Sequence, residues 1–119
     1  MTEVLAGGSG DSIIVAEAYA DLAVGTFYVQ AGFDSISRTS EGRYTIGIAN
    51  GVVSNKNYLV FFSSGLGEYS GTGGAYGMTG DIIDKETDSF GLIVTGEVAD
   101  DRQVRDAKYV HLIILEMPD

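Results

Sequence analysis

The feature that most constrains this chain is a series of short segments in which apolar and polar residues alternate between glycine-containing turns. The clearest is RYTIGIA at residues 43–49, where Tyr44, Ile46 and Ile48 would share one face of a strand. Side chains of a β-strand point alternately to opposite faces, so a period of two predicts a half-buried strand. The chain also holds 17 glycines and one proline. Because a glycine inside a helix costs about 1 kcal/mol relative to alanine, the composition favours strands and turns over helices.

About seven such segments predict an all-β fold, an antiparallel β-sandwich or flattened barrel. The segment at 12–20 has a competing interpretation as a short helix, because alanine and glutamate favour helices. We expect a flexible N-terminal arm at residues 1–11 and, since no change in composition marks a second domain, a single domain at residues 12–119. The segment at 23–33 is expected to be one strand with a shared face formed by Phe27, Val29, Ala31 and Phe33. The predicted strands are residues 12–20, 23–33, 33–39, 43–49, 57–64, 89–98 and 108–116.

Two of these strands, at 57–64 and 108–116, are apolar on both faces. A strand in a sandwich needs only one apolar face to contact the core. The second face therefore predicts contact with a neighbour, such as another subunit. The residues that we expect at such a subunit interface are Leu59, Phe61, Tyr109 and His111.

The glycine-rich segment at 65–80 predicts a long loop or bulged hairpin. Tyrosine offers a large contact area at low cost in conformational entropy, so this segment is a candidate recognition loop that displays Tyr69, Tyr76 and Met78. The alternative is that these side chains pack back over the sandwich. The acidic residues at 81–88 are expected to form a solvated turn, and residues 99–107 a polar loop.

Motifs for catalysis, metals and nucleotides each fail at a named position. The chain has no cysteine, which excludes disulfides, thiolate zinc sites and a cysteine nucleophile. The one histidine, His111, is expected to be a partly buried, hydrogen-bonded strand residue. The segment at 7–11 has Asp11 where the G-x-S-x-G motif needs glycine, and the glycines at 65–77 lack both the G-x-G-x-x-G spacing and a Walker lysine. We therefore predict a protein that is not an enzyme and has no cofactor.

Acidic side chains cluster in the sequence at Asp81, Asp84, Glu86 and Asp88, but without the D-x-D-x-D-G spacing of a calcium loop, so no metal site is predicted. The formal net charge is −10. A chain this acidic repels nucleic-acid phosphates and anionic membranes, so neither is an expected partner. The first ten residues show no signal peptide, which leads us to expect synthesis and folding in the cytosol.

Residues 13–116 resemble the β-sandwich modules of tailed-bacteriophage virion proteins, which occur in tail and head fibres and in capsid decoration proteins. The resemblance is strongest at Ile36 to Val60, with S-I-S-R followed by E-G-R-Y-T-I. The matching positions are Arg38, Gly42, Tyr44, Asn57 and Tyr58.

This resemblance implies a homotrimer located in the virion and made in the host cytoplasm. Because the arm is short, it favours a capsid decoration (cement) protein that binds the phage major capsid protein and stabilises the head. The alternative is a tail-fibre or head-fibre module that recognises a host surface glycan. In the first case the arm would lie along the capsid, and its expected contact residues are Thr2, Glu3, Val4 and Leu5.

Overall fold

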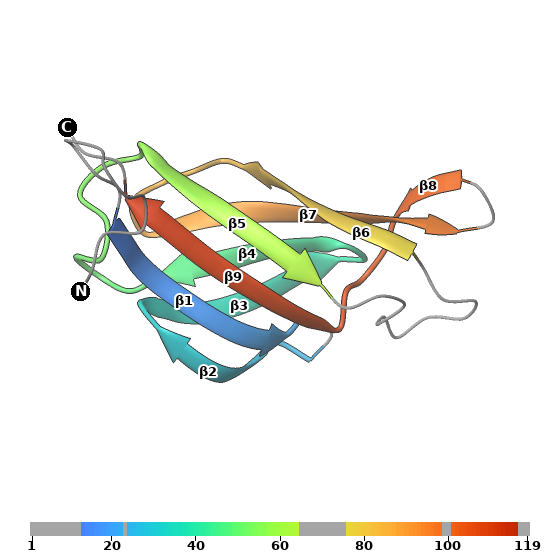
Figure 1. The fold of residues 1–119 in the computed structure, drawn as a ribbon, viewed down its shortest axis with the longest axis horizontal. Helices are drawn as coiled ribbons and strands as arrows, with labels where there is room; N and C mark the ends of the chain where they lie inside the picture. Colours follow the sequence, from blue (N-terminus) through green and yellow to red (C-terminus); the bar gives the residue numbers. More distant parts are fainter. Residues whose placement is uncertain (1–12, 23, 65–75, 99–100, 117–119) are drawn as a thin grey trace.

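The computed structural model describes residues 13–22, 24–64, 76–98 and 101–116. In these residues nine strands form two packed antiparallel sheets, and none forms a helix (Figure 1). The prediction of an all-β sandwich is confirmed, and the helical alternative for residues 12–20 is wrong. The strands are β1 (Ile13–Asp21), β2 (Thr26–Ala31), β3 (Phe33–Ser40), β4 (Arg43–Ile48), β5 (Tyr58–Ser64), β6 (Tyr76–Ile83), β7 (Ser89–Val98), β8 (Asp101–Val104) and β9 (Tyr109–Glu116).

The two sheets have different strand orders. Sheet A has the order β2-β1-β9-β5 and lies in front in Figure 1. Sheet B has the order β3-β4-β7-β6, and β8 pairs with the part of β7 that extends beyond β4. The centre of sheet A therefore joins β1 to β9, the first and last described strands, over eight residue pairs.

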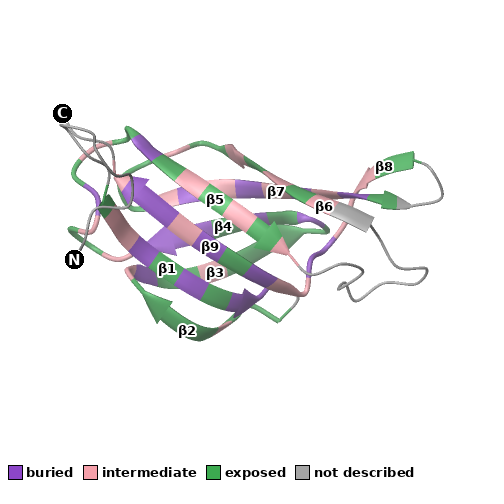
Figure 2. Ribbon diagram, viewed as in Figure 1, coloured by how far each residue is buried: buried purple, intermediate pink, exposed green. Residues whose placement is uncertain are grey.

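The core fills the space between the sheets, and burial alternates along the strands as the sequence pattern predicts (Figure 2). Sheet A contributes small side chains from β1, namely Ala16, Ala18 and Ala20, each at most 2% exposed. Larger side chains from other strands fill the remaining volume. The largest fully buried ones are Tyr58, Phe90, Leu22, Ile46, Ile48, Leu92, Leu112, Ile114, Val94 and Val110.

Gly32 divides the single strand expected at 23–33 into two strands in different sheets. Its φ of +88° suits glycine, and a Cβ there would lie 2.7 Å from the Cβ of Ala16. Before Gly32, β2 pairs with β1; after it, β3 pairs with β4. The expected common face is therefore wrong, because Val29 is 70% exposed on sheet A whereas Phe33 is buried in the core.

Strands β6 and β8 were missing from the sequence prediction. The segment at 65–80 was expected to be irregular, but residues 76–80 belong to β6, which continues through the start of the expected acidic turn. Along this strand Met78 and Ile82 pack against the core while Asp81 is exposed. Met78 is thus half-buried and packs against the core, which is the alternative that the sequence left open for this segment.

Candidate functional site

The outer face of sheet A is apolar, and it is the candidate site. Of the eight large apolar side chains that remain exposed among the described residues, six belong to its strands. The other two are Val24, in the turn before β2, and Ile83 on β6. Exposed apolar surface gathered on one face marks an interaction site more often than the same residues scattered singly. The six are Ile13, Tyr19, Tyr28, Val29, Leu59 and Phe61. Ile13 pairs with Glu116, which also pairs with the buried Tyr58, so Ile13 lies at the core side of the sheet and the other five lie on the outer face.

The strand register explains why these residues lie together. Cross-strand pairing joins Glu17 of β1 to Ile113 of β9, and Ile113 to Phe61 of β5. The next row joins Tyr19 to His111 and His111 to Ser63. Directly paired residues in adjacent strands place their side chains on the same face of the sheet. The rows therefore form a continuous surface across all the strands of sheet A, which we call the sheet A face.

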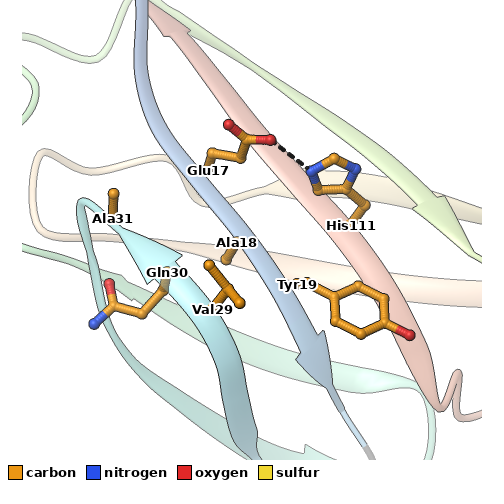
Figure 3. A pocket seen from close by; sticks show the side chains of 7 residues that line it. All are labelled: Glu17, Ala18, Tyr19, Val29, Gln30, Ala31 and His111. Atoms are coloured by element: carbon orange, nitrogen blue, oxygen red, sulfur yellow. Dashed lines mark hydrogen bonds and ion pairs between the residues drawn. The ribbon is translucent and has the colours of Figure 1, made fainter.

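His111 lies near the middle of the sheet A face. Its Nε2 atom is 3.0 Å from Oε2 of Glu17, and the side chains are 45% and 56% exposed, respectively (Figure 3). Two open hollows, of about 160 and 150 Å³, lie beside this histidine, one toward β2 and the other toward β5. Ser63 lines the second hollow, yet it makes no hydrogen bond to His111 in the described structure. The histidine is thus a polar partner of Glu17 on an open surface rather than a base positioned against a nucleophile.

Three tyrosines form a cluster at one end of the sheet A face. The ring centroid of Tyr19 lies 5.6 Å from that of Tyr28 and 6.2 Å from that of Tyr109. Lys108 places its Nζ atom 5.1 Å from the centre of the Tyr109 ring. The Tyr28 hydroxyl donates a hydrogen bond of 3.3 Å to Asp21, and its pKa is raised by desolvation and by that carboxylate. The cluster is a half-exposed aromatic surface beside a buried carboxylate.

The outer face of sheet B has a different character. Its exposed positions on β3 and β4 are mostly small and polar. Among the described residues of sheet B, the one exposed large apolar side chain is Ile83 of β6, which is 40% exposed. The sandwich therefore has one polar and one apolar outer face. The polar positions on β3 and β4 are Ser35, Ser37, Thr39, Arg43 and Thr45.

A second polar cluster is buried and has a structural role. Asp106 accepts two hydrogen bonds from Nε of Arg38, of 3.1 and 3.2 Å, one of 2.9 Å from the Arg38 Nη2 atom and one of 2.8 Å from the backbone N–H of Gly42. The Tyr44 hydroxyl donates a further hydrogen bond to the same carboxylate. Burial alone would raise the pKa of Asp106, but these hydrogen bonds outweigh burial and lower it. The cluster ties the β3–β4 hairpin to the segment before β9.

The Asp106 cluster gives a structural role to positions singled out in the sequence. Three of those five positions are Arg38, Gly42 and Tyr44, and all three donate to Asp106. A fourth, Tyr58, is fully buried, and its hydroxyl donates to the Glu86 carbonyl at 2.7 Å. Burial raises the pKa of Tyr58 to about 12, which keeps the donor protonated. The pattern therefore encodes a folded framework.

The structure brings together the four residues expected at an interface. Leu59, Phe61, Tyr109 and His111 all lie on the sheet A face. Sequence analysis missed Tyr19, Tyr28 and Val29 as residues of the same face. The remaining candidates cannot be placed: Tyr69 and the arm residues Thr2, Glu3, Val4 and Leu5 lie outside the described residues, and the side chain of Tyr76 is not described.

Comparisons with models of protein families, with curated proteins and with solved structures found no match. Within the described ranges, no group of three or more His, Cys, Asp or Glu side chains is arranged to hold a metal ion. The same residues contain no helix long and apolar enough to cross a membrane. The sheet A face is therefore the feature on which a functional proposal can be built.

Proposed function

We propose that this protein is a structural protein of a tailed-phage particle, of the capsid decoration type, which binds the major capsid protein and stabilises the head as a homotrimer. The observation that carries the proposal is the apolar sheet A face, because exposed apolar side chains gathered on one face are typical of a surface that another protein covers. The resemblance of residues 13–116 to virion modules supplies the context.

The proposed mechanism is burial of surface at repeated contacts. Each square ångström of apolar surface removed from water contributes about 25 cal/mol, so a covered face is a substantial source of binding free energy. On a particle, several linked contacts act together, and their effective concentration strengthens modest individual affinities. A sandwich whose strands are held by buried hydrogen bonds, such as those that Asp106 accepts, suits this task because little conformational entropy is lost on binding.

Counting copies in purified phage particles tests the proposal. A decoration protein should be present at a copy number comparable with that of the major capsid protein, as measured by quantitative mass spectrometry of both proteins. A much smaller number, similar to that of the tail proteins, would point to the fibre alternative. Absence of the protein from the particle would overturn both.

The N-terminal arm is tested by deleting residues 2–10. We expect the truncated protein to bind empty capsids more weakly than the full chain in a co-sedimentation assay, because the arm would lie along the shell. A matched sample with the substitution Thr45→Ala on the polar face of sheet B should bind as the full chain does. Unchanged binding by the truncated protein would contradict a role for the arm.

Recognition of a host glycan is the second candidate, and the tyrosine cluster favours it. Sugar rings present apolar faces that stack on aromatic side chains, and Tyr19 and Tyr28 are 45% and 50% exposed. In a glycan-array experiment, binding that is lost in Tyr28→Ala and retained in Ile83→Ala would support this candidate. The same array showing no binding by the unmodified protein would count against it.

A further inference from the structure

We infer that the sheet A face is the surface on which a second copy of this chain docks. The inference rests on the proposed function, in which copies of the chain assemble, and it names the surface through which they do so. Three properties of the face support this occupant: its apolar character, its near neutrality and its shape.

Apolar side chains lie at both edges and in the centre of the face, around the Glu17–His111 pair. Phe61 is 51% exposed and Leu59 is 45% exposed on β5, while Val29 is 70% exposed at the opposite edge of the sheet. Ile113, between them on β9, is only half-buried although it lies in the centre of the sheet. Exposed apolar side chains spread over a whole sheet are stabilised by a partner that covers the sheet from edge to edge.

The charge distribution selects the kind of partner. With a formal net charge of −10, two copies repel each other over most of their surface. On the sheet A face, the exposed carboxylate of Glu17 is paired with His111. Asp21 is 3% exposed beneath the Tyr28 hydroxyl, and Lys108 adds a positive charge beside it. This face is therefore where two acidic copies can meet with little repulsion, whereas a basic partner or an anionic membrane would find few charges to bind.

The shape of the face suits a copy of itself. Val29 and Phe61 project from its two edges, and the two hollows beside His111 lie between them. Around a threefold axis, the projecting edge of one copy's face meets the hollows at the other edge of the next copy's face. The Glu17 carboxylate is within hydrogen-bond distance of His111 Nε2, 3.0 Å away, so it already has a polar partner on this face, whereas a buried ion without one is costly.

Matched lysine substitutions test the inference. Phe61→Lys places a charge on the sheet A face, and Ile83→Lys places the same charge on the outer side of β6. We expect sedimentation equilibrium to give a multiple of the protomer mass for the unmodified protein and for Ile83→Lys, but the protomer mass for Phe61→Lys. Both substitutions reduce the net negative charge equally, so a general charge effect would move both variants in the same direction.

A second variant covers the case in which Phe61→Lys fails to fold. Val29 is 70% exposed, so Val29→Lys should keep the far-UV circular dichroism spectrum of the unmodified protein and still give the protomer mass. An unmodified protein that is monomeric throughout the concentration series overturns the inference. So does a folded Val29→Lys variant that associates as strongly as Ile83→Lys.

The outcomes separate this inference from the proposed function. A self-associating protein that is absent from phage particles would overturn the function and leave the docking surface standing. A monomeric protein found at high copy number in particles would overturn the docking surface and the trimer and leave the decoration role standing. A third arm uses vesicles of neutral phosphatidylcholine: binding that is lost in Phe61→Lys, without self-association of the unmodified protein, would assign the face to lipid and overturn the inference.

Discussion

Replacing Asp106 by alanine should destabilise the fold more than any exposed substitution, because the carboxylate serves two buried donors as well as Arg38. The substitution leaves the backbone N–H of Gly42 and the hydroxyl of Tyr44 without an acceptor, and both hydrogen bonds are buried. A buried polar group without a partner costs about 1–3 kcal/mol, so two cost about 2–6 kcal/mol together. That is a large share of the roughly 5–15 kcal/mol by which a typical domain is stable.

Urea unfolding measures this cost. The chain has no tryptophan, so far-UV circular dichroism and tyrosine fluorescence are the suitable probes. The protein concentration is held constant, because association would stabilise the folded state by mass action. The matched control is Glu41→Ala, which removes the 47% exposed carboxylate that pairs with Arg105 at 3.2 Å. An exposed pair of this kind contributes less than about 1 kcal/mol.

The size of the difference decides the matter. We expect Asp106→Ala to lose at least about 2 kcal/mol more than Glu41→Ala, with Tyr44→Phe between them because it removes one donor and leaves the other hydrogen bonds of the carboxylate in place. An Asp106→Ala variant that is as stable as Glu41→Ala would refute the view that this cluster holds the hairpin to the segment before β9.

Three further predictions use the same unfolding assay. Gly51→Ala should lower the free energy of unfolding by about 1–2 kcal/mol, because φ at Gly51 is +81° and the new Cβ would meet no atom within 4 Å. Gly42→Ala should lower it more, because φ is also positive there and the new Cβ would lie 2.9 Å from both the Arg105 nitrogen and the Val94 oxygen. Since the pKa of Asp106 is lowered on folding from 3.8, its stabilisation is present above about pH 3.8 and is lost as the pH falls through the folded-state pKa. The stability difference between the unmodified protein and Asp106→Asn should therefore shrink in acid, and a constant difference would argue against the assignment. Tyr58→Phe should cost about 1 kcal/mol through the lost hydrogen bond to Glu86, and no loss would show that this bond contributes nothing net.

The sequence predicts the strands best where the apolar period is regular. The strand at 89–98 has the predicted bounds, and Tyr44, Ile46 and Ile48 are buried as expected. The errors arise where backbone conformation matters more than side-chain pattern. At Gly32 a positive φ redirects the chain between sheets, which a pattern of side chains does not reveal.

The candidate site was predictable only in part for a related reason. Leu59 and Phe61 stand out because their strand has two apolar faces within its own sequence. Tyr19 and Tyr28 come from different strands, and only the pairing of β1 with β2 and β9 brings their rings together with that of Tyr109. The role of Asp106 was likewise hidden, because its partners lie more than 60 positions away in the chain.

The pairing of β1 with β9 has a consequence for how the protein is made. Residues 13–21 leave the ribosome long before residues 109–116, so β1 has only β2 as a neighbour in sheet A for most of synthesis. Contacts between such distant segments close late and slow the folding of β-proteins. The surface that we assign to docking is completed only when β9 inserts between β1 and β5. Nascent chains would thus lack the finished docking surface, and self-assembly would be delayed until translation has passed residue 116.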